Sequence, residues 1–213
     1  MTASQDNQST TTADSPHRQE SAPTPAGNPL LDVAYIAVFA ALIIALAFVA
    51  IPVGAAGVPI VLQNAAVILA GLILGRTRGF LTALLFLGLG LIGLPVLAGG
   101  KTTLAALGGP TIGYLVGYLV SATVAGSIAY LAPRGNRKAL TIYLALGAIA
   151  ALACQYLCGS VGMMFRADMS FGQALAVNVP FLIPDLIKAT CAVAIASGVH
   201  LSLPDIRRKA FLK

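Results

Sequence analysis

Two oppositely charged residues, Asp185 and Lys188, stand in an otherwise apolar stretch of this 213-residue chain. They are three positions apart, so on an α-helix both side chains share one face. A lone charge at the centre of a bilayer costs at least ~2.5–3.5 kcal/mol on insertion scales, so such residues face the protein interior and serve function. A buried carboxylate and ammonium can bind a polar ligand. The alternative is a structural ion pair that locks two helices together.

Further polar and aromatic groups could complete a ligand pocket around this pair. Two segments of small residues, 52–63 and 94–110, are suited to covering a pocket, and polar side chains lie in them or directly beside them: Gln63, Asn64 and Lys101. Four aromatic side chains are candidates to line an apolar part of the site: Tyr114, Tyr118, Tyr156 and Phe181. For both groups the alternative is an ordinary role in helix packing or at the membrane interface.

Two prolines lie beside the charged pair, at Pro180 and Pro184. Each removes a backbone donor and frees a carbonyl in the preceding turn. Interrupted helices beside buried charges build substrate sites near the middle of many transporters. A simple kink needed for packing is the alternative interpretation.

The sequence contains no set of residues typical of an enzyme. It has no phosphate-binding loop of the Walker type, so the chain does not hydrolyse ATP by itself. Its two histidines, His17 and His200, lie near opposite ends and do not suggest a catalytic triad. Cys154 and Cys158 share a helix face, but in this apolar context they are interpreted as packing residues rather than metal ligands. We therefore expect no catalytic residues, no metal and no cofactor.

The composition indicates a protein that faces lipid. Hydrophobic residues make up 58% of the chain and charged residues only 9%, and the mean hydropathy is +0.89. A soluble domain carries roughly 25% charged residues, because its surface must be hydrated. The sequence therefore predicts an all-α integral membrane protein. The net charge is +6, and the basic residues occur in short clusters between the apolar runs. This distribution favours a role in membrane topology over nucleic-acid binding.

Six apolar runs are candidates for membrane spans, of which the second is short compared with the roughly 20 residues that cross the hydrocarbon core. They cover residues 31–51, 60–75, 80–97, 110–131, 139–158 and 174–203. The chain is thus expected to have a disordered polar tail over 1–29, a six-helix transmembrane domain over 30–205 and a basic tail over 206–213.

The basic residues predict the orientation of these spans. With six spans, ten of the thirteen Lys and Arg residues lie on one side of the membrane: Arg18, Arg76, Arg78, Arg134, Arg137, Lys138, Arg207, Arg208, Lys209 and Lys213. The other side keeps Lys101 and Arg166, and Lys188 is the basic residue inside a span. Among the acidic residues only Asp185 lies well inside a span. The positive-inside rule then places both termini in the cytoplasm.

Four motifs occur in an order and spacing that resemble a known family. They are VPIVLQ at 58–63, GLPVLAGG at 93–100, GGPTIGYLVGY at 108–118 and PFLIPDLIKA at 180–189. Together they are similar to the BioY family, the biotin-specific substrate-binding (S) components of energy-coupling-factor (ECF) vitamin transporters. The resemblance covers residues 31–203. The chain departs from the family's usual pattern at Lys101-Thr102-Thr103.

The resemblance implies a multi-pass protein of a bacterial-type cell membrane that binds biotin from outside. It implies docking on a transmembrane coupling protein that is driven by paired ATPase subunits. Asp185 and Lys188 match the ligand-contacting D-x-x-K motif of the family. The first helix places small residues at helical spacing, and in the family such a face contacts the coupling protein: Ala34, Ala37, Ala41 and Ala45.

The chemistry of biotin fits these residues. Asp185 is expected to accept hydrogen bonds from the ureido N–H groups. Lys188 is expected to donate either to the ureido oxygen or to the carboxylate of the ligand, and the sequence does not choose between them. The alternatives are an S component for another vitamin and a membrane scaffold protein without a transport role.

Overall fold

The computed structural model describes residues 29–51 and 60–207. The elements up to the middle of the chain are α1 (Pro29–Ala47), β1 (Ala50–Ile51), β2 (Ile60–Val61), α2 (Gln63–Leu74), α3 (Arg76–Leu91) and α4 (Thr103–Leu107). The remaining elements are α5 (Ile112–Ala129), α6 (Arg137–Arg166), α7 (Phe171–Ala176), α8 (Val179–Ser202) and the 3-10 helix η1 (Pro204–Arg207). The two short strands pair in antiparallel fashion, with Ala50 opposite Val61.

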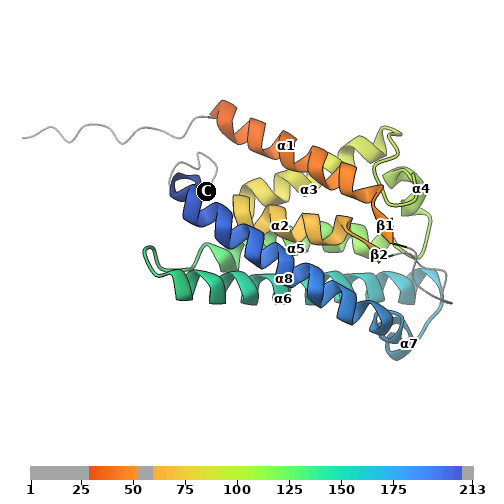
Figure 1. Ribbon diagram of the computed structural model, residues 1–213. Coiled ribbons are helices and arrows are strands. Elements are labelled where there is room, and N and C mark those ends of the chain that lie inside the picture. The colour runs from red at the N-terminus through yellow and green to blue at the C-terminus, as the bar shows by residue number, and fades with distance from the viewer. Residues whose placement is uncertain (1–28, 52–59, 208–213) are drawn as a thin grey trace, which may run out of the picture.

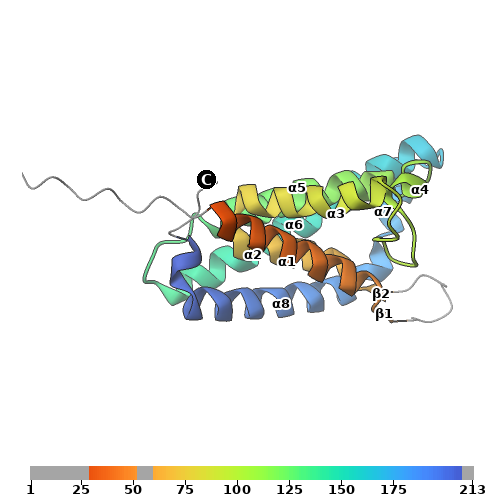
Figure 2. The same cartoon turned by 90° about the horizontal axis from the view of Figure 1, so that it is seen from above.

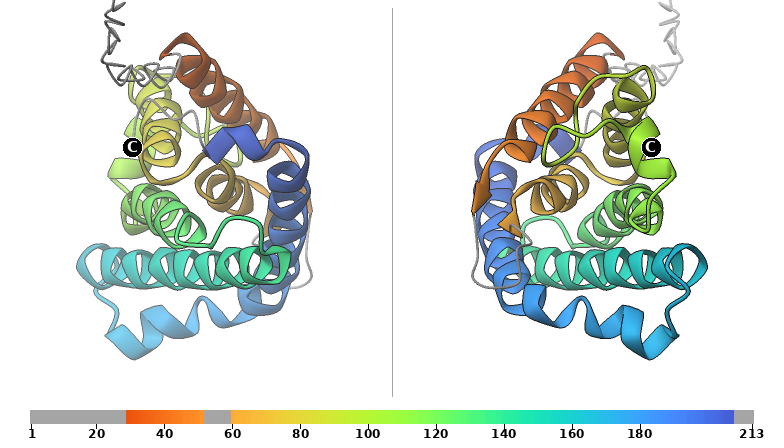
Figure 3. Two further views of the ribbon diagram at one scale, coloured as in Figure 1. Left: turned by 90° about the vertical axis from the view of Figure 1, so that its left-hand side faces the viewer. Right: turned by 90° about the vertical axis from the view of Figure 1, so that its right-hand side faces the viewer.

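The long helices run side by side along one axis (Figure 1, Figure 2). The β1–β2 pair, α4 and α7 lie at one end of the bundle, and the start of α1 and the end of α8 lie at the other (Figure 1). Seen along the axis, α2 lies in the middle, surrounded by α1, α3, α5, α6 and α8 (Figure 3). This position explains why ten of the twelve residues of α2 are buried.

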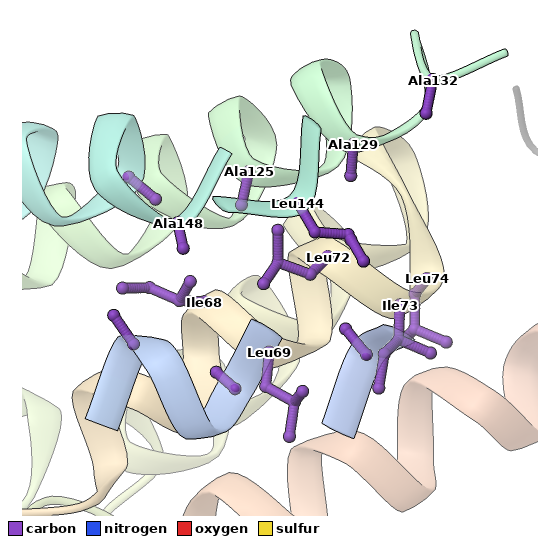
Figure 4. Packing of buried hydrophobic residues seen from close by; sticks show 14 of the residues in the cluster. Ile68, Leu69, Leu72, Ile73, Leu74, Ala125, Ala129, Ala132, Leu144 and Ala148 are labelled. Atoms are coloured by element: carbon purple, nitrogen blue, oxygen red, sulfur yellow. The ribbon is translucent and has the colours of Figure 1, made fainter. Parts of the chain in front are cut away.

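The core of the bundle combines large aliphatic side chains from α2 with small residues from its neighbours. Ile68, Leu72 and Leu144 are almost fully buried and pack in one cluster. Figure 4 shows that Ala125 and Ala148 approach this cluster from α5 and α6. Small residues at such positions let helix backbones come close together, which is the usual basis of helix packing in membranes.

Glycines bring α5 and α6 into direct backbone contact. A Cβ atom added at Gly113 would lie 2.0 Å from the Cys158 carbonyl oxygen, and one at Gly162 would lie 2.5 Å from the Gly113 backbone nitrogen. No side chain fits at these separations. The contact therefore requires glycine, and it fixes the position of Tyr114, which follows Gly113 on α5.

The all-helical prediction is confirmed, and the outer surface of the bundle suits lipid. Four helices are long and apolar enough to cross a membrane: α1, α5, α6 and α8. Large apolar side chains are exposed on their outer faces, among them Val38, Ile149 and Ile183. The expected spans over 60–75 and 80–97 are shorter helices, α2 with 12 residues and α3 with 16.

The expected boundaries of the third span were wrong at both ends. Helix α3 begins at Arg76 rather than at residue 80, because Gly75 lets the chain turn with φ at 85° and α3 starts directly after it. The helix ends at Leu91 rather than at residue 97. Gly93 follows with φ at 101°, a left-handed conformation that ends helices and favours glycine.

The expected sixth span is divided, and the fifth is longer than expected. Residues 171–176 form α7 and residues 179–202 form α8, so Pro180 lies in the first turn of α8, where a missing N–H costs nothing. Pro184 alone lies inside that helix. Helix α6 continues to Arg166, eight residues beyond the expected end at Cys158. The break between α7 and α8 places Asn178 at a helix start.

Two predictions fall largely on residues outside the described ranges. The tail over 1–29 lies outside them except for Pro29, and most of the segment over 52–63 does too. Of the expected basic tail, Ile206 and Arg207 belong to η1, and Ile206 is buried against the bundle.

Candidate ligand-binding site

The centre of the site is the ion pair between Asp185 and Lys188 on α8. The two side chains form a salt bridge one helical turn apart, with 5% of the Asp185 and 11% of the Lys188 side chain exposed. Pro184 directly precedes Asp185, and α8 packs against α2 and α6 at this level. The pair therefore lies inside the bundle rather than facing lipid.

The first turn of α2 closes over this pair. Asn64 donates from Nδ2 to Asp185 Oδ1 at 3.1 Å, and its Oδ1 accepts from Lys188 Nζ at 2.9 Å. Lys188 also donates to the Val61 carbonyl oxygen in β2 at 2.8 Å. An ammonium has three N–H donors. All three are therefore engaged, one each to Asp185, Asn64 and Val61.

Helix α6 contributes a third set of contacts. The Tyr156 hydroxyl donates to Asp185 Oδ2 at 2.6 Å. The neighbouring residue Gln155 is buried and donates from Nε2 to Ser121 Oγ at 3.0 Å and to the Asn64 carbonyl oxygen at 3.3 Å. Three helices, α2, α6 and α8, are thus joined through one polar network around Asp185.

A cavity of about 200 Å³ lies beside this network. Its polar walls come from Gln63, Lys101, Tyr114, Tyr118 and Thr111. Apolar walls complete it: Leu97, Ala98, Ala106 and Leu115. Gln63 and Asn64 are consecutive, and one faces the cavity while the other holds the ion pair, so the two features share the start of α2. The volume is below the roughly 300–1,000 Å³ of pockets for drug-sized ligands, which suits a compact molecule.

One part of the cavity wall, Leu97, Ala98 and Lys101, belongs to a tight turn between α3 and α4. The Leu97 N–H donates to the Lys101 carbonyl oxygen at 2.9 Å, and Gly99 and Gly100 between them have φ at 76° and 72°. Gln63 anchors the same segment by donating from Nε2 to the Val96 carbonyl oxygen at 2.8 Å. Consecutive left-handed residues favour glycine. The turn therefore holds Leu97 and the exposed Lys101 at the cavity.

A second polar network, not expected from the sequence, fixes one wall. The Tyr114 hydroxyl donates to Asn178 Oδ1 at 2.6 Å, and Asn178 Nδ2 donates to Ser160 Oγ at 3.0 Å. Asn178 is 4% exposed. The sequence carried a signal for these residues, since Gln155, Ser160 and Asn178 are polar groups within or beside apolar runs. Their partners could be found only in three dimensions.

The structure thus brings together eight of the nine expected site residues. Asp185, Lys188, Asn64 and Tyr156 form the ion-pair network, while Gln63, Lys101, Tyr114 and Tyr118 line the cavity. Phe181 lies one turn before Asp185 on α8, half-buried. Phe181 is not among the described residues that line the cavity. Among the described residues no cluster of His, Cys, Asp or Glu could hold a metal ion.

A second buried ion pair, which was not predicted from the sequence, lies at the opposite end of the bundle. Arg78 and Asp32 form a salt bridge with side chains 1% and 2% exposed. Arg78 also donates from Nη1 to the Ile206 carbonyl oxygen at 3.2 Å, and its guanidinium lies 5.7 Å from the centre of the Tyr35 ring. The sequence placed Arg78 in a loop between spans. It lies in the first turn of α3, where the pair joins α1, α3 and η1.

Comparisons with known proteins agree on the family. The sequence model of the BioY family matches residues 16–205. The biotin transporter BioY of Rhodobacter capsulatus is 40% identical over 185 residues, covering 82% of this chain and 95% of that protein. The biotin transporter BioY of Thermotoga maritima is 37% identical over 160 residues, covering 75% of this chain and 89% of that protein.

A solved structure is also similar to the fold. The crystal structure of the S-component for biotin from an ECF-type ABC transporter superposes with a TM-score of 0.70 at 31% sequence identity. The match covers 81% of this chain and 92% of that one. The family model, the sequence relatives and the similar fold agree, and this chain belongs to the BioY family.

Proposed function

We propose that this chain is the biotin-binding S component of an ECF-type transporter and takes up biotin across the cell membrane. The observation that carries the proposal is the compact cavity beside the buried Asp185–Lys188 pair, in a chain of the BioY family. An apolar pocket with a few well-placed polar groups is the general form of a small-molecule site. The named functions of the relatives support biotin as the occupant.

The contacts in the site suggest how biotin is held. Asp185 accepts from three donors, and a carboxylate has about four lone-pair positions, so one remains for a ureido N–H. Lys188 can contact the ligand only after it releases Asn64 or Val61, because its three donors are engaged. Lys188 is therefore proposed to contact the ureido oxygen or the carboxylate by exchanging one of these partners. Tyr118, Leu97 and Leu115 are placed to pack on the rings.

The topology proposed for the chain has six spans and both termini in the cytoplasm, in a multi-pass cell-membrane protein. The charge distribution supports it. Arg78 and Arg207 contact groups at the end of the bundle that holds the α5–α6 loop. Arg166 reaches the Leu107 carbonyl oxygen at the other end, which also holds the cavity. The site then opens to the outside, as uptake requires.

The topology is testable with single cysteines in a variant that lacks Cys154, Cys158 and Cys191. A cysteine at position 136 should react with a membrane-impermeant maleimide only in opened cells. A cysteine at position 168 should react in intact cells. The reverse pattern would contradict the proposed orientation.

The proposed partners are a transmembrane coupling protein and its paired ATPase subunits. Ala34, Ala37, Ala41 and Ala45 all lie exposed on α1. A surface of small residues allows another helix to approach closely within the bilayer, which supports this face as the docking surface.

The decisive experiment is calorimetric titration of the purified protein in detergent with biotin, desthiobiotin and thiamine. Tight binding that selects biotin over thiamine supports the proposal. Selective binding of thiamine would instead assign another vitamin to the chain. No binding by a monodisperse sample with a cooperative thermal transition would contradict an S component and favour a scaffold role.

A further inference from the structure

A second cavity lies at the end of the bundle opposite the proposed biotin site. Its volume is about 240 Å³, and it lies between the α5–α6 loop and the end of α8. Four of its lining residues are basic or imidazole side chains: Arg134, Arg137, His200 and Arg207. The others are Pro133, Gly135, Asn136, Leu140, Leu201 and Pro204. None of these ten described residues carries a carboxylate.

The arginines of this cavity form no salt bridge with a carboxylate among the described residues. The ion pairs there join Arg78 to Asp32 and Lys188 to Asp185, and none involves an arginine of the cavity. Burial of the Arg207 guanidinium lowers its pKa, and the charge of Arg134 acts in the same direction. Arg134 and Arg207 both line this cavity, so two like charges share one space. An anion bound between them would relieve this repulsion.

The walls of the cavity are held in place by the fold. Arg207 donates from Nη2 to the carbonyl oxygens of Ala132 at 2.9 Å and Tyr130 at 3.2 Å, and its guanidinium lies 5.3 Å from the centre of the Tyr130 ring. These contacts use carbonyl groups at the end of α5, which carry partial negative charge. Arg207 is thus fixed by the backbone, while Arg134 and Arg137 remain exposed beside it.

His200 supplies a buried polar group with unused hydrogen-bonding capacity. It is 5% exposed, and its Nε2 lies 2.9 Å from the Leu72 carbonyl oxygen. A carbonyl only accepts, so Nε2 carries the proton. Within the described residues Nδ1 has no hydrogen-bond partner. Among these residues Nδ1 is therefore a buried hydrogen-bond acceptor without a donor, which a headgroup hydroxyl of a ligand could supply but a phosphate oxygen could not.

We propose that this cavity binds the phosphate group of an anionic phospholipid. Arginine matches phosphate oxygens with paired N–H donors, and three guanidinium groups line the cavity. The apolar rim favours a lipid over free phosphate, because Leu201 is 48% exposed and would contact the glycerol and acyl part. The cavity also lies at the strongly basic end of the bundle, where anionic headgroups of a cytoplasmic leaflet would meet it.

The test is the thermal stability of the full chain in neutral detergent with added short-chain lipids. Dihexanoyl phosphatidylglycerol should raise the Tm saturably, by about 3–6 °C at tenfold excess over its Kd. Dihexanoyl phosphatidylcholine and inorganic phosphate, at equal concentration, should raise it by less than a third as much. An equal shift with inorganic phosphate would overturn the assignment to a lipid. No shift with phosphatidylglycerol would overturn the site itself.

Matched variants separate this cavity from general surface charge. Arg134→Gln/Arg137→Gln should abolish the shift with phosphatidylglycerol and leave biotin binding unchanged. Arg76→Gln/Lys138→Gln removes the same charge from the same end, from exposed residues that do not line the cavity, and should keep the shift. Equal loss in both double variants would mean that the lipid responds only to net charge, and the proposal would fail.

Discussion

Asn64 and Lys188, which lie 124 positions apart in the chain, are joined by a hydrogen bond of 2.9 Å. The same amide donates to Asp185 Oδ1 at 3.1 Å, so Asn64 contacts both members of the ion pair. Its neighbour Gln63 lines the cavity. A ligand that displaces a contact of Gln63 in the cavity would therefore also affect the hydrogen bonds of Asn64 to the ion pair.

Replacing Asp185 with Asn should weaken biotin binding about tenfold or more, because Asn removes the charge that pairs with Lys188 and leaves a buried ammonium unbalanced. Calorimetric titration measures the change. Asp168→Asn is the matched control: Asp168 is exposed, and its φ of 50° suits asparagine. Unchanged affinity in Asp185→Asn would remove this carboxylate from the proposed site.

A double variant separates a ligand-binding pair from a structural one. Lys188→Met alone should destabilise the protein by about 3–5 kcal/mol, because it leaves a buried carboxylate unpaired, whereas Asp185→Leu/Lys188→Met should recover much of that loss. If the pair contacts the ligand, the double variant unfolds near the wild-type Tm but binds no biotin. A double variant that still binds biotin tightly would assign the pair to helix packing.

Asn178 is expected to act on the ligand through Tyr114. Asn178→Ala and Tyr114→Phe should each lower biotin affinity by about fivefold, the value of one hydrogen bond of ~1 kcal/mol. The double variant should lose little more than either single one, because both changes remove the same contact. Tyr143→Phe serves as the control, since Tyr143 lies on α6 far from the cavity lining. Full additivity would contradict a positioning role.

The exposed alanines of α1 are predicted to be needed for assembly but not for binding. Ala41→Leu should strongly reduce copurification with the coupling protein, because the larger side chain keeps the helices apart. Biotin affinity should stay as in the wild type. Ala153→Leu on α6 is the control, since Ala153 is exposed on another face. Equal loss of copurification in both variants would argue against a docking surface on α1.

The α5–α6 contact predicts opposite outcomes for two glycine substitutions. Gly113→Ala should lower the Tm, since its Cβ would lie 2.0 Å from the Cys158 carbonyl oxygen and the backbones would have to separate. Gly88→Ala in α3 has no atom within 4 Å of the added Cβ, so it should be neutral or stabilise the helix by up to ~1 kcal/mol. Thermal unfolding in detergent compares the two. A stable Gly113→Ala variant would contradict the close packing.

The sequence alone was sufficient for the features that depend on local composition. The low charge and long apolar runs predicted an all-helical bundle, because a chain in lipid must satisfy its backbone hydrogen bonds within each segment. The same reasoning selected Asp185 and Lys188, since charges within apolar runs are costly. The four motifs identified the family. Span ends were less accurate, because they depend on single residues such as Gly75 and Gly93 that permit turns.

Only the tertiary structure decided which distant side chains meet. Asn64 joins the ion pair, Asn178 holds Tyr114, and Arg78 pairs with Asp32 across 46 positions. None of these contacts follows from helical periodicity, because periodicity fixes the face of each helix but not the rotation or height at which two helices pack. Those are set by small residues such as Gly113, whose contact distances the sequence does not contain.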